Sequence, residues 1–227
     1  MMEIKLPLVV INFKTYPQAS GERGLLLAQT CEAVAKEYGV SVAVAPQIPD
    51  LYPICRGVDI PVLSQHMDSV EPGQNTGHIV GETLVEIGCR GTLLNHSERR
   101  MLLADVEGAV RRAELLNLMS IVCTNNVMTS VAAAAMRPNA VAIEPPELIG
   151  TGVSVSKSKP EVVAGTVAAI RSVNKDVVIL CGAGISNGED VRAAIDLGTQ
   201  GVLLASAVTK SNRPADVLRD LLAPLRE

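Results

Sequence analysis

Eight short apolar runs recur along the chain, and patterns of helical period lie between most of them. Runs of this length, rich in Val, Ile and Leu, are typical of parallel strands that are buried on both faces. The interval 46–59 has room for only a short helix. The runs predict strands over residues 8–12, 41–45, 60–65, 91–96, 120–124, 140–144, 177–182 and 201–206.

One helical pattern is especially regular. Apolar side chains at positions 27, 31, 34 and 38 repeat with helical spacing, and Gly39 stands where a helix-ending glycine is expected. Two further helices should begin at capping boxes, Ser158 to Glu161 and Ser186 to Glu189. Pro214 should begin the last helix.

The alternation of strands and helices predicts an α/β fold. Eight units in 227 residues leave about 28 residues per unit, which suits a compact (β/α)₈ barrel of eight parallel strands with surrounding helices. We therefore expect a single barrel domain over residues 1–227. The rival is a doubly wound open sheet, but that fold carries a glycine-rich dinucleotide loop after its first strand, and VVINFKTYPQ has no glycine.

Charge and cysteine usage narrow the function. A net charge of −4 without a basic run argues against nucleic acid and acidic membranes as partners. The apolar N-terminal run is too short to span a membrane and lacks a small-residue cleavage site, so we expect a cytoplasmic protein. The five cysteines are far apart, without a CxxC motif or a histidine at metal spacing. Reduced thiols are therefore expected rather than disulfides or zinc, with no metal and no cofactor.

Polar residues stand where the predicted strands end. In a (β/α)₈ barrel those ends meet at one mouth, where catalytic groups belong. A carboxylate, an imidazole, a lysine and glycine-rich turns would therefore converge there. The residues concerned are Asn12, Lys14, Asn95, His96, Glu144, Gly182, Ala183, Gly184, Ala205 and Ser206.

Each of these residues also has an ordinary structural interpretation. Glu144 could be a solvated turn residue before two prolines, His96 a structural histidine and Lys14 a surface lysine. Glu98 could simply favour a helix start, and the glycines after residue 181 could form a plain tight turn. Convergence on one mouth instead indicates proton transfer next to a carbonyl, on a small phosphorylated substrate.

Four segments carry a family resemblance. INFK (11–14), NHSERR (95–100), AIEPPELIGTG (142–152) and CGAGI (181–185) resemble signatures of the triosephosphate isomerase family, in order and at compatible spacing. The short chain is similar to the archaeal members. The resemblance implies a cofactor-independent enzyme of glycolysis and gluconeogenesis, which interconverts dihydroxyacetone phosphate and D-glyceraldehyde 3-phosphate through an enediolate.

The resemblance also implies catalytic roles. Glu144 matches the base that moves a proton between the two substrate carbons. His96 matches a neutral imidazole that acts as electrophile, and a helix start at residues 97 and 98 would disfavour its protonation. Lys14 matches the cation that offsets enediolate and phosphate charge, Asn12 a donor near the substrate oxygen, and Glu98 a carboxylate that orients Lys14.

Backbone N–H groups would hold the phosphate, according to the same resemblance. They belong to Gly150 in a lid whose tip includes Ile149, to Gly184, and to Ala205 and Ser206. Many relatives have Ser in place of Gly184 and Gly-Gly in place of Ala205-Ser206. Those substitutions keep the N–H donors, but a serine hydroxyl contact is lost.

The family further implies a homo-oligomer, with a tetramer favoured over a dimer. GQNTGH (73–78) resembles a loop that enters a neighbouring subunit's site, so Thr76 would support the partner's Lys14. The alternative is an ordinary surface loop.

Two other functions remain open. One is another sugar-phosphate barrel enzyme, such as an aldolase, but a Schiff-base aldolase needs a lysine within a strand and no predicted strand contains one. The other is a phosphate-ligand binding protein that kept the fold. The complete set of acid–base residues favours the isomerase.

Overall fold

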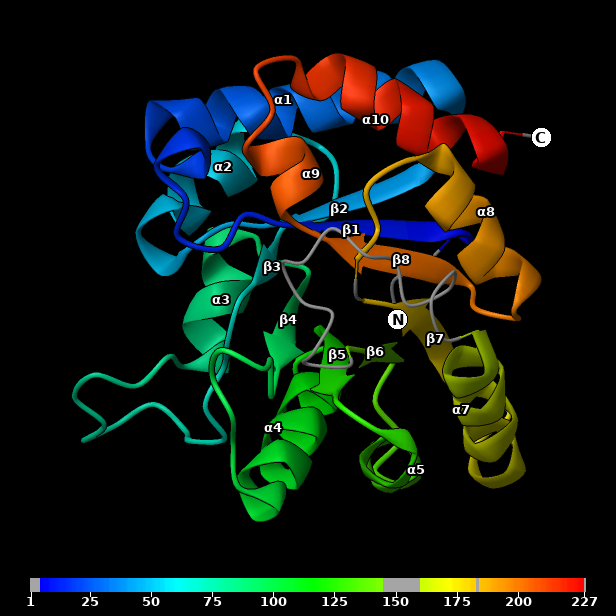
Figure 1. The fold of residues 1–227 in the computed structure, drawn as a ribbon. Coiled ribbons are helices and arrows are strands. Elements are labelled where there is room, and N and C mark those ends of the chain that lie inside the picture. Colours follow the sequence, from blue (N-terminus) through cyan, green and yellow to red (C-terminus); the bar gives the residue numbers. More distant parts are fainter. Residues whose placement is uncertain (1–4, 145–159, 183, 227) are drawn as a thin grey trace.

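Eight parallel strands with surrounding helices form the fold of the computed structural model, which describes residues 5–144, 160–182 and 184–226 (Figure 1). The strands are β1 (Leu8–Asn12), β2 (Ser41–Ala45), β3 (Leu63–Ser64), β4 (Gly91–Leu94), β5 (Met119–Thr124), β6 (Ala140–Ile143), β7 (Val178–Cys181) and β8 (Gly201–Leu204). The α-helices are α1 (Glu22–Tyr38), α2 (Leu51–Gly57), α3 (Gly81–Ile87), α4 (Leu103–Leu115), α5 (Val127–Ala135), α7 (Pro160–Val173), α8 (Gly188–Asp196), α9 (Ser206–Thr209) and α10 (Pro214–Leu222). The predicted (β/α)₈ fold is confirmed.

The order of the strands excludes the open sheet. They run β2-β1-β8-β7-β6-β5-β4-β3, so the first strand lies beside the last. An isolated parallel bridge between Val44 and Val62 joins β2 to the segment of β3 and closes the ring. Closure brings the carboxyl ends of all eight strands to one mouth.

Alternating side chains of each strand enter two separate apolar layers. Leu8 and Val10 of β1 belong to the cluster inside the barrel, whereas Val9 and Ile11 pack in the layer between strands and helices. Since both faces are buried, the strands read as continuous apolar runs rather than as alternating ones. Figure 1 shows α1 and α10 together on one side of the barrel and α4 and α5 on the other.

The third strand is the weakest part of the ring. The sequence predicts it over residues 60–65, but only Leu63 and Ser64 form a regular ladder, with Gly91 and Thr92 of β4. Pro61 has no N–H to donate, and its carbonyl oxygen accepts a single bond from the Val44 N–H at 3.0 Å. The short helix expected before it is observed as α2.

Some of the helix ends predicted from the sequence are observed, and others are not. Gly39 ends α1 in the left-handed conformation with φ 68°, and Pro214 begins α10, as predicted. The capping box proposed at Ser186 is wrong, because α8 is capped by Asn187, whose side chain accepts from the Asp190 N–H. Ser158 lies outside the described residues.

The predicted helix start at residues 97 and 98 is also wrong. The chain makes a turn there, with the Arg99 N–H donating to the His96 carbonyl at 2.8 Å, and α4 begins only at Leu103.

No helix in the described part of the chain is both long enough and apolar enough to cross a membrane. The cytoplasmic location expected from the sequence stays a prediction.

Candidate active site

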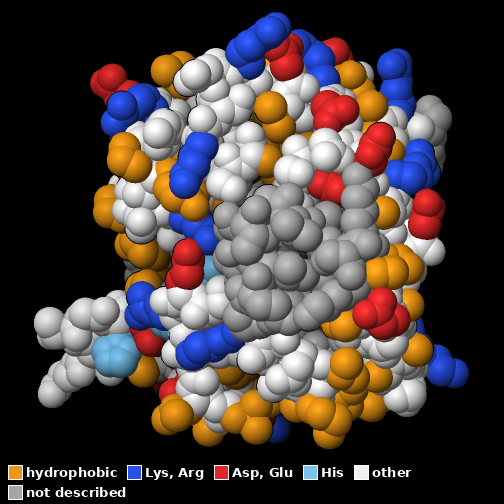
Figure 2. All heavy atoms as spheres, viewed as in Figure 1, with side chains coloured by type: hydrophobic (Ala, Val, Ile, Leu, Met, Phe, Trp, Pro, Cys, Tyr) orange, Lys and Arg blue, Asp and Glu red, His pale blue; other side chains and the backbone are white. Residues whose placement is uncertain are grey.

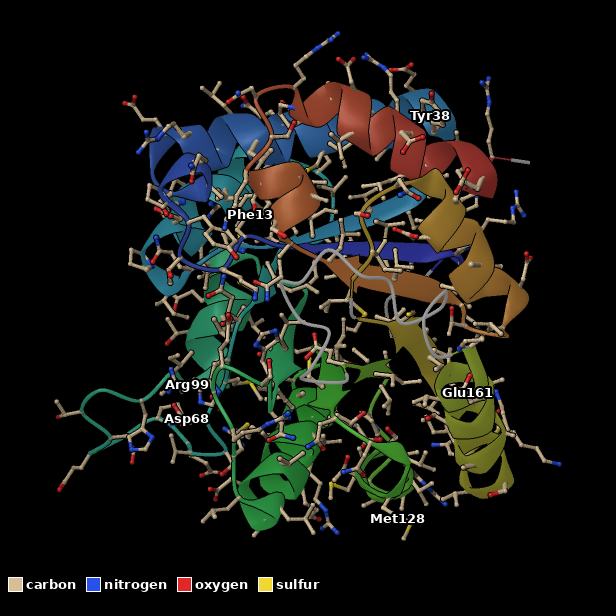
Figure 3. The ribbon with its side chains drawn as sticks, in the orientation of Figure 1. Phe13, Tyr38, Asp68, Arg99, Met128 and Glu161 are labelled. Carbon is tan, nitrogen blue, oxygen red and sulfur yellow. The ribbon has the colours of Figure 1, made fainter. Side chains whose placement is uncertain are left out.

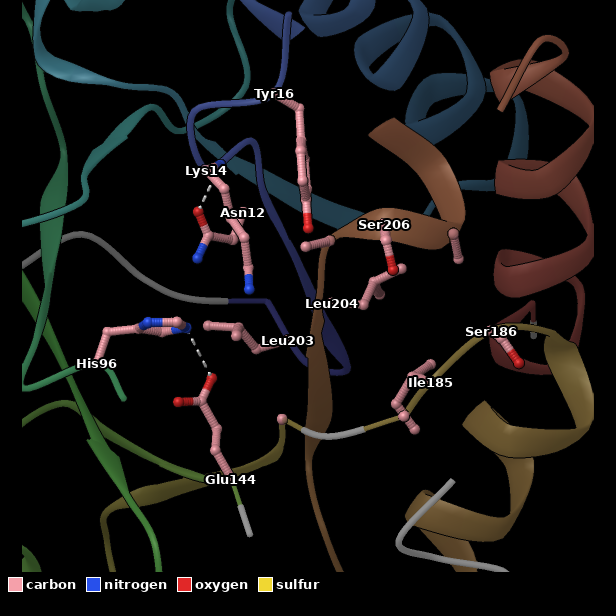
Figure 4. A pocket seen from close by; sticks show the side chains of 14 residues that line it. Asn12, Lys14, Tyr16, His96, Glu144, Ile185, Ser186, Leu203, Leu204 and Ser206 are labelled. Atoms are coloured by element: carbon pink, nitrogen blue, oxygen red, sulfur yellow. Dashed lines mark hydrogen bonds and ion pairs between the residues drawn. The ribbon is translucent and has the colours of Figure 1, made fainter. Parts of the chain in front are cut away.

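A cavity of about 190 Å³ opens at the barrel mouth (Figure 4). Eight of the residues singled out in the sequence line it: Asn12, Lys14, His96, Glu144, Gly182, Gly184, Ala205 and Ser206. They come from the ends of β1, β4, β6, β7 and β8, so the closed ring brings together side chains that are up to 194 positions apart, from 12 to 206. Ile149 and Gly150 lie outside the described residues.

The turn after β1 holds Lys14 in an unusual backbone conformation. Its φ of 49° is left-handed, which non-glycine residues rarely adopt. The buried Asn12 side chain stabilises this turn, because its Oδ1 accepts from the Lys14 N–H at 2.9 Å. The Lys14 Nζ then reaches Glu98 Oε1 at 2.8 Å. Strain of this kind is found where a side chain must be aimed.

Gln65 secures the same turn from the end of the third predicted strand. Its Nε2 lies 2.9 Å from the Lys14 and Ala45 carbonyl oxygens and 3.3 Å from Asn12 Oδ1. Sequence reasoning missed this residue, although Gln65 is the polar end of an apolar run in the same way as Asn12. Reading every strand end by the same rule would have found it.

His96 is aimed by a second left-handed residue. Asn95 has a φ of 57°, and its side chain donates to the Cys123 carbonyl at 3.0 Å and accepts from the Met101 N–H at 3.0 Å. These two bonds fix the chain where it leaves β4. The buried imidazole that follows is directed into the cavity (Figure 4).

The hydrogen bonds of the His96 ring define its tautomer. The Glu98 N–H donates to Nδ1 at 3.2 Å, so a neutral ring carries its proton on Nε2. That nitrogen lies 3.5 Å from Glu144 Oε1. The ring therefore turns its N–H side toward the cavity and toward the carboxylate.

Glu144 is enclosed at the end of β6. Its N–H donates to the Thr124 carbonyl at 2.7 Å, and the Gly182 N–H donates to the Ile143 carbonyl at 2.9 Å. A Cβ on Gly182 would lie 2.6 Å from the Glu144 Cγ. The carboxylate stem thus occupies the space that a side chain at position 182 would need, and Oε2 has no hydrogen-bond partner among the described residues.

Burial shifts the two titrating groups in opposite directions. It raises the pKa of Glu144 to about 8, and Cys123 and the charge of Lys14 offset part of that rise. Burial also lowers the pKa of His96 to about 4, with the nearby cations Lys14 and Arg100 acting in the same direction. Desolvation disfavours the charged form of each group. A carboxyl that titrates near neutrality therefore faces an imidazole that stays neutral.

This depression of the His96 pKa has a different cause from the one predicted. A helix N-terminus was expected to disfavour the imidazolium, but no helix begins at residues 97 and 98. Removal of the ring from water takes its place. The direction of the effect is the same.

Glu98 and Thr76 stand outside the cavity. Glu98 lines a neighbouring hollow and approaches His96 Nδ1 with its Oε2 at 3.5 Å. Thr76 is exposed on the loop that projects from the body before α3 (Figure 1). Asp68 and Ile79 close the base of this loop, since the Asp68 N–H donates to the Ile79 carbonyl at 3.0 Å and the Ile79 N–H donates to Asp68 Oδ2 at 2.7 Å.

Tyr16 lines the cavity and is also a residue that sequence reasoning missed. Its side chain points into the cavity on the side of Ser206 (Figure 4). The Lys210 Nζ lies 4.5 Å from the centre of its ring, within the range of a cation–π contact. The signal was weak, because Tyr16 follows Lys14 by two residues in a loop without a strand pattern.

The described residues contain no group of three or more His, Cys, Asp or Glu side chains arranged to hold a metal ion. The polar side chains gathered at the mouth include those of Glu144, His96, Lys14 and Asn12. A base, a neutral hydrogen-bond donor and a cation around one small cavity can remove a proton next to a carbonyl and stabilise the resulting oxyanion.

The chain is similar to known proteins over nearly its whole length. Residues 7–221 match the family model described as triosephosphate isomerase. A triosephosphate isomerase from Methanocaldococcus jannaschii is 55% identical over 215 residues, which cover 95% of this chain and 98% of the relative. Those from Methanothermobacter thermautotrophicus and Methanosarcina acetivorans are 53% and 52% identical, over 98% and 95% of this chain and 97% of each relative.

Proposed function

The chain belongs to the triosephosphate isomerase family, and from this membership we propose that the cavity at its barrel mouth interconverts dihydroxyacetone phosphate and D-glyceraldehyde 3-phosphate through an enediolate. The protein is an isomerase of glycolysis with a triose phosphate as substrate. The single barrel is the catalytic unit.

The observation that supports this proposal most directly is the pairing of Glu144 with His96. Their Oε1 and Nε2 atoms are 3.5 Å apart in one cavity. A base is most effective when its pKa is close to the working pH, and burial raises the pKa of Glu144 to about 8. Glu144 takes the proton from one carbon and returns it to the next. His96, held neutral, donates its Nε2 hydrogen to the substrate oxygens in turn.

The remaining polar groups stabilise negative charge. Lys14 faces the enediolate with its ammonium, and the Asn12 side chain fixes the turn that presents it. Glu98 orients the ammonium through the 2.8 Å ion pair. The phosphate lies against the N–H groups of Gly184, Ala205 and Ser206, which line the same cavity. The first N–H groups of α9 have no partner within that helix and are suited to an anion.

The expected phosphate contacts of Ile149 and Gly150 fall outside the described residues. They enter the proposal from the resemblance of EPPELIGTG to the family's lid segment alone.

We also propose that the enzyme works as a homo-oligomer, with a tetramer favoured over a dimer. Two features support this. The loop that carries Thr76 projects from the body with Asp68 and Arg99 at its base (Figure 3). Hydrophobic side chains also gather over α4 and α5 (Figure 2); Leu102, Leu103, Leu115 and Met128 are each at least 63% exposed. Apolar surface of this kind marks contacts between protein molecules.

One purified preparation tests both statements. We expect it to interconvert the two triose phosphates in a coupled assay without added metal or nucleotide, and after treatment with a chelator. Light scattering on the same sample should give four times the monomer mass. Tight binding of a triose phosphate without turnover would contradict the proposed reaction, and a monomer mass would contradict the proposed assembly.

The protonation state of His96 gives a pH prediction. Because burial lowers its pKa to about 4, the ring should stay neutral, with its proton on Nε2, between pH 8 and about pH 5. The folded-state pKa lies below the ordinary value of 6.5, so between pH 6.5 and about 4 the unfolded chain binds a proton that the folded protein does not. The folded protein should therefore lose stability as the pH falls from 6.5 toward about 4. ¹⁵N NMR of the imidazole would measure this, with the signal assigned by its loss in His96→Gln. Protonation of the ring above pH 6 would refute the neutral-electrophile role.

A further inference from the structure

Two cysteines that are far apart in the sequence meet at the end of the barrel opposite the active site. Cys55 lies in α2, and Cys89 lies between α3 and the start of β4. Their Sγ atoms are 3.7 Å apart, and both are thiols in this structure. No sequence motif indicates this pair, because the two residues are separated by 34 positions.

The two thiols differ in a way that suits consecutive roles. Cys55 is partly exposed, whereas Cys89 is only 3% exposed. The hydrogen bond with Cys89 lowers the pKa of the Cys55 thiol, and the charges of Arg90 and Arg56 act in the same direction. The pKa of Cys89 is raised by the same hydrogen bond and by burial. Cys55 is therefore the accessible sulfur that becomes a thiolate, and Cys89 is the protected thiol next to it.

The segment between the two cysteines has the least regular structure in the described barrel. It begins at the end of α2 and contains α3, a helix of seven residues, and the two-residue strand β3. It also contains the projecting loop closed by Asp68 and Ile79. A cross-link around such a segment restricts the unfolded chain and so stabilises the folded one.

We propose that Cys55 and Cys89 form a thiol modification site that exchanges with small-molecule disulfides and closes to an intramolecular disulfide. The Cys55 thiolate attacks one sulfur of the small disulfide, forms a mixed disulfide and releases one thiolate. Cys89 then gives up its proton and attacks the Cys55 sulfur, which releases the second thiolate. The protein dithiol loses two electrons and two protons, and the small disulfide becomes two thiols.

The geometry requires little movement. Closing from 3.7 Å to a bond of about 2.05 Å is within reach of side-chain rotation. Cys31, Cys123 and Cys181 have no accessible surface and should not react while the protein is folded. Neither Cys55 nor Cys89 lines the cavity at the mouth, so the isomerase activity should be unchanged by oxidation.

Oxidised glutathione is the probe for this site. The full-length folded protein is incubated with it, the remaining thiols are alkylated after unfolding, and the peptides are mapped by mass spectrometry. We expect one disulfide, between Cys55 and Cys89, and three alkylated cysteines. The melting temperature of the oxidised form should be higher by roughly 5 to 10 °C, and reduction should reverse the shift.

Single variants separate the two steps. Cys89→Ser should stop at a glutathione mixed disulfide on Cys55, and Cys55→Ser should leave Cys89 unmodified. The proposal is overturned if the wild-type protein keeps both thiols at high ratios of oxidised to reduced glutathione. A mixed disulfide on Cys55 that does not pass to Cys89 would overturn it equally, as would a disulfide involving any of the three buried cysteines.

Discussion

Glu144→Gln should lower kcat by about 10³-fold, the scale of a lost general base. The amide has nearly the shape of the carboxylate but cannot accept the proton that the proposed reaction moves. The pocket formed with Gly182 is occupied as before, so the substrate should still bind. The loss should therefore appear in kcat much more than in KM.

The same substitution should stabilise the fold at alkaline pH. Burial raises the pKa of Glu144 from 4.5 to about 8, so between those values the folded protein holds a proton that the unfolded chain has released. Its stability consequently falls as the pH rises through that window, and above about 8 the full cost of a buried carboxylate is present. Glutamine has no such cost. The melting temperature of the variant should exceed that of the wild type at pH 9, and the difference should shrink toward pH 5.

A steady-state assay and thermal melts at the two pH values measure both effects. Glu22→Gln is the matched control, because Glu22 is an exposed carboxylate in the first turn of α1. It should change neither kcat nor the pH dependence of melting. A Glu144→Gln enzyme with wild-type kcat would exclude Glu144 as the base. An inactive variant that melts at lower temperature at pH 9 would instead indicate a damaged site.

The strand ends could be predicted from the sequence because they depend on local chemistry. An apolar run stops at a polar residue where the strand leaves the core, and this rule placed Asn12, His96 and Glu144 at the mouth. Ring closure then supplied the proximity that no local pattern contains. Gln65 obeys the same rule at the end of the strand predicted over residues 60–65, so it too could have been predicted from the sequence.

The wrong expectations share one physical origin, namely tertiary contacts that override a local signal. SERR has the charge pattern of a helix start, yet the left-handed Asn95 and its bonds to Cys123 and Met101 hold the segment in a turn. Ser186 has capping-box spacing, but its N–H and hydroxyl both donate to Asp190 Oδ2, at 3.0 and 2.8 Å. Asn187 is left as the cap, and α8 begins one residue later.

The contact between Cys55 and Cys89 also could not be predicted from the sequence. Spacing rules for cysteines detect pairs within a motif. These two residues are 34 positions apart, and their contact depends on how α2 packs beside α3. Reduced thiols stay a prediction from the sequence. Their proximity follows only from the fold.

Lys14→Met should lower kcat/KM by about 10³-fold, the upper range for loss of one group that stabilises an oxyanion. The Lys14 side chain is only 13% exposed, so its ammonium acts in a site where little water can replace it. In the proposed reaction it faces both the enediolate and the phosphate. Its loss should therefore raise KM and lower kcat together, which distinguishes it from the Glu144 variant.

The fold should tolerate this change. The bonds that hold residue 14 in its left-handed conformation involve its main-chain N–H and carbonyl, which meet Asn12 and Gln65, and methionine retains both. The partner Glu98 is 57% exposed, so it can be solvated when the ion pair is lost, and the cost in stability should stay below about 1 kcal/mol. Lys36→Met is the control, since Lys36 is 64% exposed and pairs with Glu32. If the Lys14 variant keeps kcat/KM close to that of this control, the cation has no part in the reaction; a large loss with an unchanged melting temperature assigns it to the transition state.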